Sequence, residues 1–323
     1  MKIAFLFPGQ GAQYPKMALD LMEASEEVKA LFSLASEIFG RDMKDLLEHC
    51  DPEILKRTDV SQPCINLANL AASIYLEERG IKPFASAGFS LGEYAALAAA
   101  GVISREDCLL LVNERGKAMQ AAIDNIRAES AVPETGAPGM MAVIGLAPEQ
   151  AEALINGWKN QGLADLYAAN INSPKQLVVS GSAAALAEAE KRFMQAGARR
   201  TLRLSVAGPF HSPYMKKAIP DFEPFLQKIT FNDPVIPVFS NVTGKQIQSG
   251  AEAKVLALRQ IEEAVRWIDI ERALADLRPD LLLETGPGKV LQGLWKDSGS
   301  ALPCLGAGTG SEIGLLEIKP EAI

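Results

Sequence analysis

The sequence lacks the residue patterns on which metal sites and disulfide frameworks depend. It has only four cysteines and two histidines in 323 residues. The cysteines are widely scattered, with no Cys-x-x-Cys pair and no histidine cluster: Cys50, Cys64, Cys108 and Cys304. Zinc sites, redox dithiols and disulfide-rich domains need closer or more regular spacing. We therefore expect no metal and no cofactor.

Long apolar runs and excess positive charge are also missing. No apolar segment approaches the roughly 18 residues that span a bilayer. The N-terminus offers only Ile3–Phe7 before Pro8, too short for the core of a signal peptide. These absences predict a cytoplasmic protein without membrane contact. The formal net charge of −8 argues against nucleic acid as a partner.

Apolar residues make up 48% of the chain, enough for the core of one large domain or two of unequal size. Residues 3–7 are continuously apolar, which predicts a strand buried on both faces of a parallel sheet. They lead into a loop, residues 8–13, with two glycines and two glutamines, one of them Gln10. Loops at the carboxyl ends of parallel strands often hold ligands, and a plain turn would not need the glutamines.

The pattern Gly-x-Ser-x-Gly at residues 88–92 is typical of a sharp turn from a strand into a helix. Residues 84–89 are short and apolar, whereas residues 91–100 are rich in alanine and leucine and stop at Gly101. Such a turn exposes one serine hydroxyl beside the N-terminus of the helix. Ser90 is therefore a candidate nucleophile. The alternative is an ordinary exposed serine in a turn that tolerates glycine.

A charged residue, Arg115, lies on an apolar helix face. At 100° per residue it shares that face with Cys108, Leu111, Val112, Met119 and Ala122. A buried guanidinium stays charged and needs an anion. Two partners remain open: a buried protein carboxylate in a structural salt bridge, or the carboxylate of a ligand near Ser90.

Residues 126–200 predict a small domain inserted into a larger α/β domain. A loop rich in Glu, Pro and Gly, residues 127–139, opens this segment. The order strand, helix, strand, strand, helix, strand then follows, over residues 140–145, 148–158, 165–171, 176–180, 183–196 and 200–206. This βαββαβ order fits a ferredoxin-like fold. The larger domain would comprise residues 1–125 and 201–323.

His211 is the better placed of the two histidines for catalysis. His49 lies in a polar stretch and reads as a surface residue, whereas His211 lies in a Gly-Pro loop that follows a predicted strand. We expect His211 to be the general base for Ser90. The α/β pattern elsewhere predicts a helix from residue 62 or 63 to 79, a strand at 235–239, a helix at 252–265 and a strand at Leu281–Glu284.

Together these motifs resemble the malonyl-CoA:acyl-carrier-protein transacylases of fatty acid synthesis and the related acyltransferase domains of polyketide synthases. The matching segments run nearly end to end: Phe7-Pro8-Gly9-Gln10-Gly11-Ala12-Gln13, Ser61-Gln62-Pro63, the Gly-x-Ser-x-Gly-Glu turn, Arg115-Gly116-Lys117-x-Met119-Gln120, Asn172-Ser173-Pro174, Gly208-Pro209-Phe210-His211-Ser212-x-x-Met215, Val265-Arg266-Trp267 and Gly286-Pro287-Gly288. The resemblance implies a hydrolase-like α/β core with a parallel sheet and an inserted ferredoxin-like subdomain, in agreement with the pattern of predicted elements.

The resemblance also implies the catalytic groups. Ser90 would be the nucleophile and His211 its base. A backbone carbonyl, rather than a carboxylate, orients the histidine in this family, and the matching residue is Gln260. The backbone N–H groups of Gln10 and Leu91 would form the oxyanion hole.

Three further residues are implied in substrate binding. Arg115 would bind the malonyl carboxylate, Gln62 would line the pocket, and Phe210 is similar to the residue found in malonyl-selective members. The chain departs from the family at Phe89, where a histidine usually precedes the nucleophile.

The sequence thus predicts an acyltransferase that moves a malonyl group from malonyl-CoA to the phosphopantetheine thiol of acyl carrier protein, through a malonyl-serine intermediate and a ping-pong mechanism. One alternative is a thioesterase or esterase with the same serine and histidine, but α/β-hydrolases place an acidic residue between the two in the chain. The other is a docking module without activity, against which Ser90, His211 and Arg115 together argue.

Overall fold

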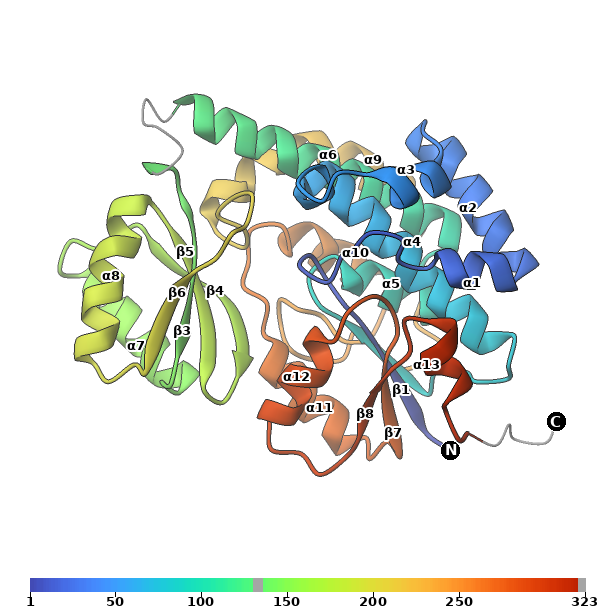
Figure 1. Ribbon diagram of the computed structural model, residues 1–323. Helices are drawn as coiled ribbons and strands as arrows, with labels where there is room; N and C mark the ends of the chain where they lie inside the picture. Colours follow the sequence, from blue (N-terminus) through green and yellow to red (C-terminus); the bar gives the residue numbers. More distant parts are fainter. Residues whose placement is uncertain (130–135, 319–323) are drawn as a thin grey trace.

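The computed structural model describes residues 1–129 and 136–318. Helices and strands alternate along the chain (Figure 1). Their order is β1 (Ile3–Phe7), α1 (Leu19–Ala24), α2 (Glu26–Phe39), α3 (Met43–His49), η1 (Ile54–Lys56), α4 (Thr58–Glu77), β2 (Ala85–Gly88), α5 (Gly92–Ala99), α6 (Arg105–Glu129), β3 (Gly139–Ile144), α7 (Pro148–Lys159), β4 (Leu166–Ser173), β5 (Gln176–Gly181), α8 (Ala183–Gln195), β6 (Arg200–Arg203), η3 (Pro213–Ala218), α9 (Ile219–Lys228), α10 (Gly250–Arg259), α11 (Trp267–Asp276), β7 (Leu281–Glu284), α12 (Val290–Asp297), β8 (Cys304–Gly306) and α13 (Gly310–Gly314).

A parallel sheet with the strand order β2-β1-β7-β8 lies at the centre of the larger part of the molecule. Successive side chains of β1 point to opposite faces of this sheet. Phe5 and Phe7 belong to the main apolar core with α4, α5 and α6, whereas Ala4 and Leu6 pack with residues of α11 and α12. Both faces are therefore covered, which explains the continuous apolar run in β1.

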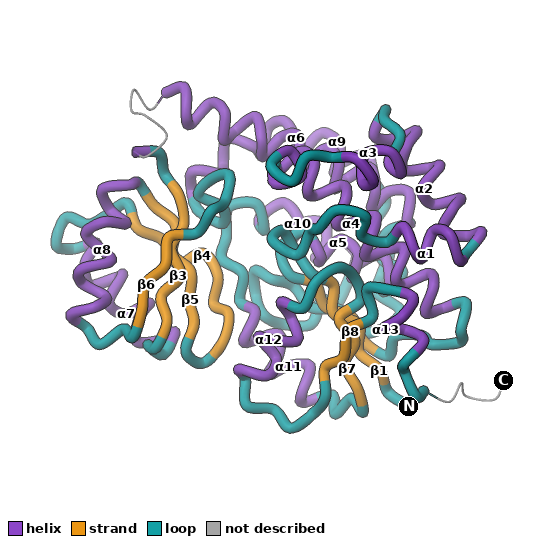
Figure 2. The backbone as a smooth tube through the Cα atoms, in the orientation of Figure 1, coloured by secondary structure: helices purple, strands orange, loops and turns teal. Residues whose placement is uncertain are grey.

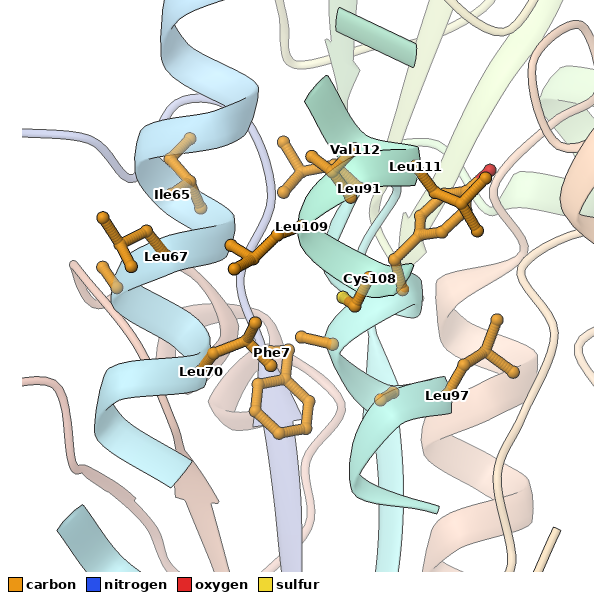
Figure 3. Packing of buried hydrophobic residues seen from close by; sticks show 14 of the residues in the cluster. Phe7, Ile65, Leu67, Leu70, Leu91, Leu97, Cys108, Leu109, Leu111 and Val112 are labelled. Carbon is orange, nitrogen blue, oxygen red and sulfur yellow. The ribbon is translucent and has the colours of Figure 1, made fainter. Parts of the chain in front are cut away.

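The main core joins the sheet to three helices. Figure 3 shows Phe7 beneath a layer in which Leu70 of α4 and Leu109 of α6 face each other. All three side chains are almost fully buried. This packing fixes α4 and α6 above the carboxyl end of β1, and this end of the sheet also carries the turn between β2 and α5.

An antiparallel sheet with the order β4-β5-β3-β6 forms the smaller part, on the left in Figures 1 and 2. Helices α7 and α8 cover one face of this sheet. Residues of the other face, including Met140 and Val178, join the main core. The predicted order of strands and helices is confirmed for this segment. The structure is thus a mixed α/β fold with one parallel and one antiparallel sheet.

Four segments differ from their sequence-based predictions. Helix α4 begins at Thr58, before the predicted start at residue 62 or 63. Residues 235–239 form no regular strand: only isolated bridges link Val238 to Ser86 and Phe239 to Gln246. Pro234 and Pro237 have no N–H to donate to a ladder.

The other two differences concern helix ends. Helix α10 ends at Arg259, not at residue 265. Helix α6 continues to Glu129, into the segment predicted as a loop from residue 127, and residues 130–135 of that segment lie outside the described residues. No helix in the described ranges combines the length and apolar character needed to cross a membrane.

Candidate active site

Ser90 lies in the tight turn between β2 and α5, with a positive φ of 51°. Both neighbouring glycines are required by close backbone approach. A Cβ at Gly88 would overlap the backbone of Gly92, and a Cβ at Gly92 would overlap the carbonyl group of Phe7 in β1. The predicted turn is confirmed, and Ser90 stands at the carboxyl edge of the parallel sheet.

His211 makes a hydrogen bond with this serine. The distance from Ser90 Oγ to His211 Nε2 is 2.9 Å. On the other side of the ring, Nδ1 lies 3.1 Å from the Gln260 carbonyl oxygen and 3.0 Å from that of Glu263. Carbonyl oxygens only accept, so the proton is assigned to Nδ1, and Nε2 is free to accept from the serine hydroxyl.

Both carbonyl groups are available to His211 because α10 ends just before them. The last carbonyls of a helix have no partner within the helix. Gln260 is the C-cap of α10, and Glu263 follows in the connection to α11. The end of this helix therefore supplies the acceptors that other serine-histidine sites obtain from a carboxylate.

The environment of His211 keeps its imidazole neutral. The residue is only 4% exposed. Burial, reinforced by the positive charge of Arg115, lowers the pKa of His211 to about 4. The ring is therefore in the form that can accept a proton from Ser90 throughout the neutral pH range.

Arg115 reaches the same serine from α6. Its Nη1 donates to Gln62 Oε1 at 2.7 Å, and its Nη2 donates to Gln260 Oε1 at 3.0 Å and to Ser90 Oγ at 3.4 Å. The side chain is fully buried, and its Nε has no partner in the described part of the chain. Burial lowers the pKa of Arg115, while nearby Tyr94 and Glu93 raise it.

No carboxylate forms an ion pair with Arg115 among residues 1–129 and 136–318. Its partners Gln62 and Gln260 are neutral amides. Of the two partners left open by the sequence, the structural salt bridge is thus not present in the described residues. A buried guanidinium that forms no ion pair with a described carboxylate, and that lies 3.4 Å from Ser90 Oγ, can bind an anionic group at this point.

Gln260 connects the three central residues. Besides its carbonyl bond to His211 and its side-chain bond to Arg115, its Nε2 donates to the Ser90 carbonyl oxygen at 3.0 Å. Gln62 bonds Arg115 and, through Nε2, contacts Met119 Sδ at 3.5 Å. Both glutamines are almost completely buried.

Gln10 and Leu91 lie on the two segments that flank Ser90. The loop after β1 packs against the turn: Phe89 N–H donates to the Phe7 carbonyl at 2.9 Å, and a Cβ at Gly9 would overlap the Phe89 carbonyl. Within residues 1–129 and 136–318, the backbone N–H groups of Gln10 and Leu91 donate to no protein acceptor. Two backbone donors are thus free beside the serine.

The two phenylalanines singled out in the sequence have separate surroundings. The Phe89 ring packs at 5.4 Å from the ring of Trp267 in α11. Phe210 is 7% exposed and belongs to the main core, and its carbonyl accepts from Ser180 Oγ at 2.6 Å. The bond to Ser180 ties the His211 loop to β5. Phe210 does not share the hydrogen bonds that connect Ser90, His211 and Arg115.

Sequence reasoning missed Asn241 and the role of Glu93 in the turn. Asn241 Oδ1 accepts from the Ser90 N–H at 2.6 Å, and Asn241 N–H donates to Glu93 Oε2 at 2.6 Å. Burial raises the pKa of Glu93 to about 7. The only sequence signal for Asn241 was its place just after the predicted strand 235–239, at the edge of the sheet that carries Ser90.

A cleft of about 920 Å³ opens between the loop after β1 and the antiparallel sheet. Gln10 and Gln13 line one side, and basic side chains contribute from several elements: Lys56, Arg57, Arg127 and Arg203. A smaller hollow of about 240 Å³ borders His211 from the side of α7 and β4. No group of three metal-ligating side chains occurs in the described ranges.

The chain is similar to known acyltransferases over almost its whole length. The model of the acyl transferase domain family matches residues 4–303. The chain is 38% identical to a malonyl CoA-acyl carrier protein transacylase of Haemophilus influenzae over an alignment of 298 residues. This alignment covers 91% of each protein.

Solved structures of malonyltransferases are also similar to this chain. An acyl carrier protein S-malonyltransferase from Vibrio cholerae superposes with a TM-score of 0.87 at 34% identity, covering 97% of this chain and 99% of that one. A malonyl-transacylase solved in complex with a type II polyketide synthase acyl carrier protein gives a TM-score of 0.87 at 34% identity, covering 97% of this chain and 98% of that one. The chain therefore belongs to the acyl transferase domain family, within the group of malonyl CoA-acyl carrier protein transacylases.

Proposed function

We propose that this protein transfers the malonyl group of malonyl-CoA to the phosphopantetheine thiol of acyl carrier protein. The observation that carries the proposal is the hydrogen bond between Ser90 and His211, made beside a buried Arg115 that has no carboxylate partner in the described residues. A serine-histidine pair can transfer an acyl group, and the guanidinium selects an acyl group that carries its own carboxylate. The relatives are named for this reaction.

The first half-reaction forms the malonyl-enzyme. His211 Nε2 takes the hydroxyl proton as Ser90 Oγ attacks the thioester carbonyl carbon of malonyl-CoA. The tetrahedral oxyanion accepts hydrogen bonds from the backbone N–H groups of Gln10 and Leu91. The C–S bond then breaks, the CoA sulfur takes the proton from His211, and malonyl remains on Ser90 as an ester.

The second half-reaction reverses these roles with a new thiol. His211 takes the proton of the phosphopantetheine thiol as its sulfur attacks the malonyl ester. The same two backbone donors hold the oxyanion, and the C–O bond to Ser90 breaks. His211 returns the proton to Ser90 Oγ, and malonyl leaves on acyl carrier protein. Gln260 keeps His211 in the required tautomer, because its carbonyl accepts the Nδ1 proton.

The cleft beside Gln10 suits the long pantetheine arm and the phosphates of CoA. Arg127 and Arg203 line it and donate to backbone carbonyls at 2.9 Å and 3.4 Å. A backbone carbonyl is neutral, so these hydrogen bonds do not neutralise the positive charge of either guanidinium. The charge supports binding of an anionic donor, although the chain as a whole is acidic.

We also infer the finer fold assignment. The βαββαβ order and the strand order β4-β5-β3-β6 support a ferredoxin-like insertion over residues 126–200. The parallel sheet with its serine turn supports a hydrolase-like core formed by residues 1–125 and 201–323. A cytoplasmic location remains a prediction from the sequence.

Intact mass measurement tests the function directly. Purified protein incubated with malonyl-CoA should gain the mass of one malonyl group, and holo acyl carrier protein should then remove this mass and become malonylated itself. A hydrolase would instead release malonate into water and leave the carrier protein unmodified. An unmodified carrier protein with steady malonate release would therefore replace the transferase proposal with the hydrolase.

Replacing Arg115 with alanine should change which acyl group is accepted. A hydrogen bond to a charged partner contributes roughly 1.5–3 kcal/mol, which corresponds to about 10- to 100-fold in kcat/KM. We expect malonyl transfer to fall by this factor while acetyl transfer stays level or rises. An acetyl group has no carboxylate, so in the wild type it leaves the buried guanidinium of Arg115 unpaired, and the alanine variant removes that guanidinium. The measurement is kcat/KM for malonyl-CoA and acetyl-CoA.

A surface arginine of the same helix provides the control. Arg105 pairs with Glu27 and Glu77, ten residues before Arg115 in α6. Arg105→Ala should leave the malonyl-to-acetyl ratio unchanged. If Arg115→Ala lowers the melting temperature but keeps the wild-type ratio, Arg115 has a structural role and the substrate class is open again.

A further inference from the structure

Ser90 adopts a backbone conformation that a residue with a Cβ rarely adopts. Its φ of 51° lies in the left-handed region. Such a conformation persists only where the surrounding structure holds it. The two glycines of the turn allow the chain to approach β1 and α5, but they do not by themselves fix the peptide groups on either side of Ser90.

The side chain of Asn241 bridges the turn at this point. Its Oδ1 accepts from the Ser90 N–H at 2.6 Å, and its Nδ2 donates to the Gly88 carbonyl at 2.6 Å. Asn241 is fully buried, so water cannot replace these bonds without rearrangement. The turn needs one acceptor and one donor in a single planar group, and the asparagine amide has both.

Asn241 is itself held through its backbone. Its N–H donates to Glu93 Oε2 at 2.6 Å, and its carbonyl accepts from the Arg266 N–H at 2.8 Å. Glu93 is 1% exposed and lies three residues after Ser90, in the first turn of α5. Ser90, Asn241 and Glu93 thus close a small ring of contacts between two segments that lie about 150 residues apart.

Two side chains together determine the orientation of the nucleophile. Asn241 fixes the peptide group between Phe89 and Ser90, and Gln260 fixes the next one through its bond to the Ser90 carbonyl. A peptide group is planar, so a fixed Ser90 carbonyl also fixes the direction of the Leu91 N–H. The serine hydroxyl and this backbone donor are therefore set relative to one another by the same pair of amides.

We propose that Asn241 is a positioning residue, held by Glu93, that keeps Ser90 in the conformation required for attack. The inference rests on the proposed function in that Ser90 is taken as the nucleophile. Asn241 touches neither the hydroxyl nor the acyl group, and acts through the backbone of Ser90. Its removal should slow the formation of the acyl-enzyme and leave the binding of malonyl-CoA unchanged.

The test compares substitutions at Asn241 with one at another buried asparagine. Asn241→Ala removes both side-chain bonds, and Asn241→Asp keeps the acceptor for Ser90 but turns an oxygen toward the Gly88 carbonyl. Asn66→Ala is the control, because Asn66 is equally buried but bonds Cys108 instead of the turn. The measurements are the single-turnover rate of Ser90 malonylation, the KM for malonyl-CoA and the melting temperature.

We expect both Asn241 variants to form the malonyl-enzyme about 10- to 100-fold more slowly, as the loss of one or two buried hydrogen bonds implies, with an unchanged KM. Asn66→Ala should lower the melting temperature to a similar degree and keep the wild-type rate. Wild-type rates in the Asn241 variants would overturn the proposal. So would an equal loss of rate in Asn66→Ala, because a general loss of stability would then explain the effect.

Glu93 provides a second pair of variants. A glutamine at position 93 still offers an oxygen to the Asn241 N–H, whereas an alanine does not. Glu93→Gln should therefore keep most of the malonylation rate, and Glu93→Ala should resemble Asn241→Ala. Equal rates in the two Glu93 variants would contradict the contact through which Glu93 is proposed to act.

A probe that is not a substrate separates this proposal from the proposed function. Fluorophosphonates react with activated serine hydroxyl groups whatever their natural acyl donor. If malonyl-CoA fails to modify the wild-type protein, the substrate assignment fails, but slower fluorophosphonate labelling of folded Asn241→Ala would still support the positioning role. If labelling of folded Asn241→Ala is as fast as that of the wild type, the positioning role fails whatever the substrate.

Discussion

Replacing Ser90 with alanine should abolish both the covalent malonyl adduct and the transfer of malonyl to acyl carrier protein. The only hydroxyl within hydrogen-bond distance of His211 Nε2 in the described residues is lost, and no other group of the site can form the ester. Removal of the nucleophile from a comparable serine-histidine site costs at least about a thousandfold in rate. Intact mass after malonyl-CoA treatment, together with transfer kinetics, measures both effects.

A serine of the preceding strand is the matched control. Ser86 is buried in β2, and its hydroxyl donates to the Ala96 carbonyl at 3.0 Å, away from His211. Ser86→Ala should still gain one malonyl group. A mass gain that persists in Ser90→Ala, or that maps to a cysteine such as Cys50, would rule out Ser90 as the acylated residue.

The elements that could be predicted from the sequence are those with local signals. The apolar run of β1, the Gly-x-Ser-x-Gly turn and each strand and helix predicted between residues 140 and 206 have their signal within a short window, and their order is confirmed. Local signals also predicted where the site lies. The loop after β1 and the turn after β2 both follow strands of one parallel sheet, so they meet at the same edge of it.

The start of α4 could not be predicted because its cap comes from another helix. The Thr58 N–H donates to Gln120 Oε1 of α6 at 3.0 Å, across 62 residues of sequence. Ser61, the residue just before the predicted start, has a buried hydroxyl without a partner in the described part of the chain. A short stretch of sequence around residue 61 does not include Gln120, so it could not predict this contact.

The end of α10 has a similar cause and a functional consequence. Residues 260–265 include no glycine or proline that would stop a helix. The chain leaves the helix because Val265 pairs with β4: its N–H donates to the Ala169 carbonyl at 2.9 Å, and its carbonyl accepts from the Ile171 N–H at 2.8 Å. This early end exposes the two carbonyls that hold His211, so the sheet contact helps to build the site.

Asn241 shows most clearly what local sequence signals cannot predict. Its contacts with Ser90 and Glu93 cross 151 and 148 residues. In the sequence it follows a segment with two prolines that forms only isolated bridges with its neighbours. Apart from its place just after the predicted strand 235–239, nothing in its own window distinguishes it from an asparagine in a surface turn, and only the folded arrangement gives it a role.

Replacing His211 with alanine should slow both half-reactions by about a hundredfold or more, the usual cost of losing a general base. It should also remove the acid limb of the pH profile. Because burial lowers the pKa of His211 to about 4, the imidazole remains a base as the pH falls past the ordinary histidine value. Wild-type kcat/KM should therefore stay level below pH 6.5 and decline only on approach to pH 4.

The other titratable groups near the site allow this limb to be assigned. Glu93, with a pKa of about 7, also titrates in the range, but a protonated carboxyl still offers an oxygen to the Asn241 N–H, so we expect no limb near pH 7. His49, the other histidine, is exposed on α3, and His49→Ala should match the wild type at every pH. A limb near pH 6.5 would mean that the base is solvated and is not the buried imidazole. A limb that survives in His211→Ala would mean that another group accepts the proton.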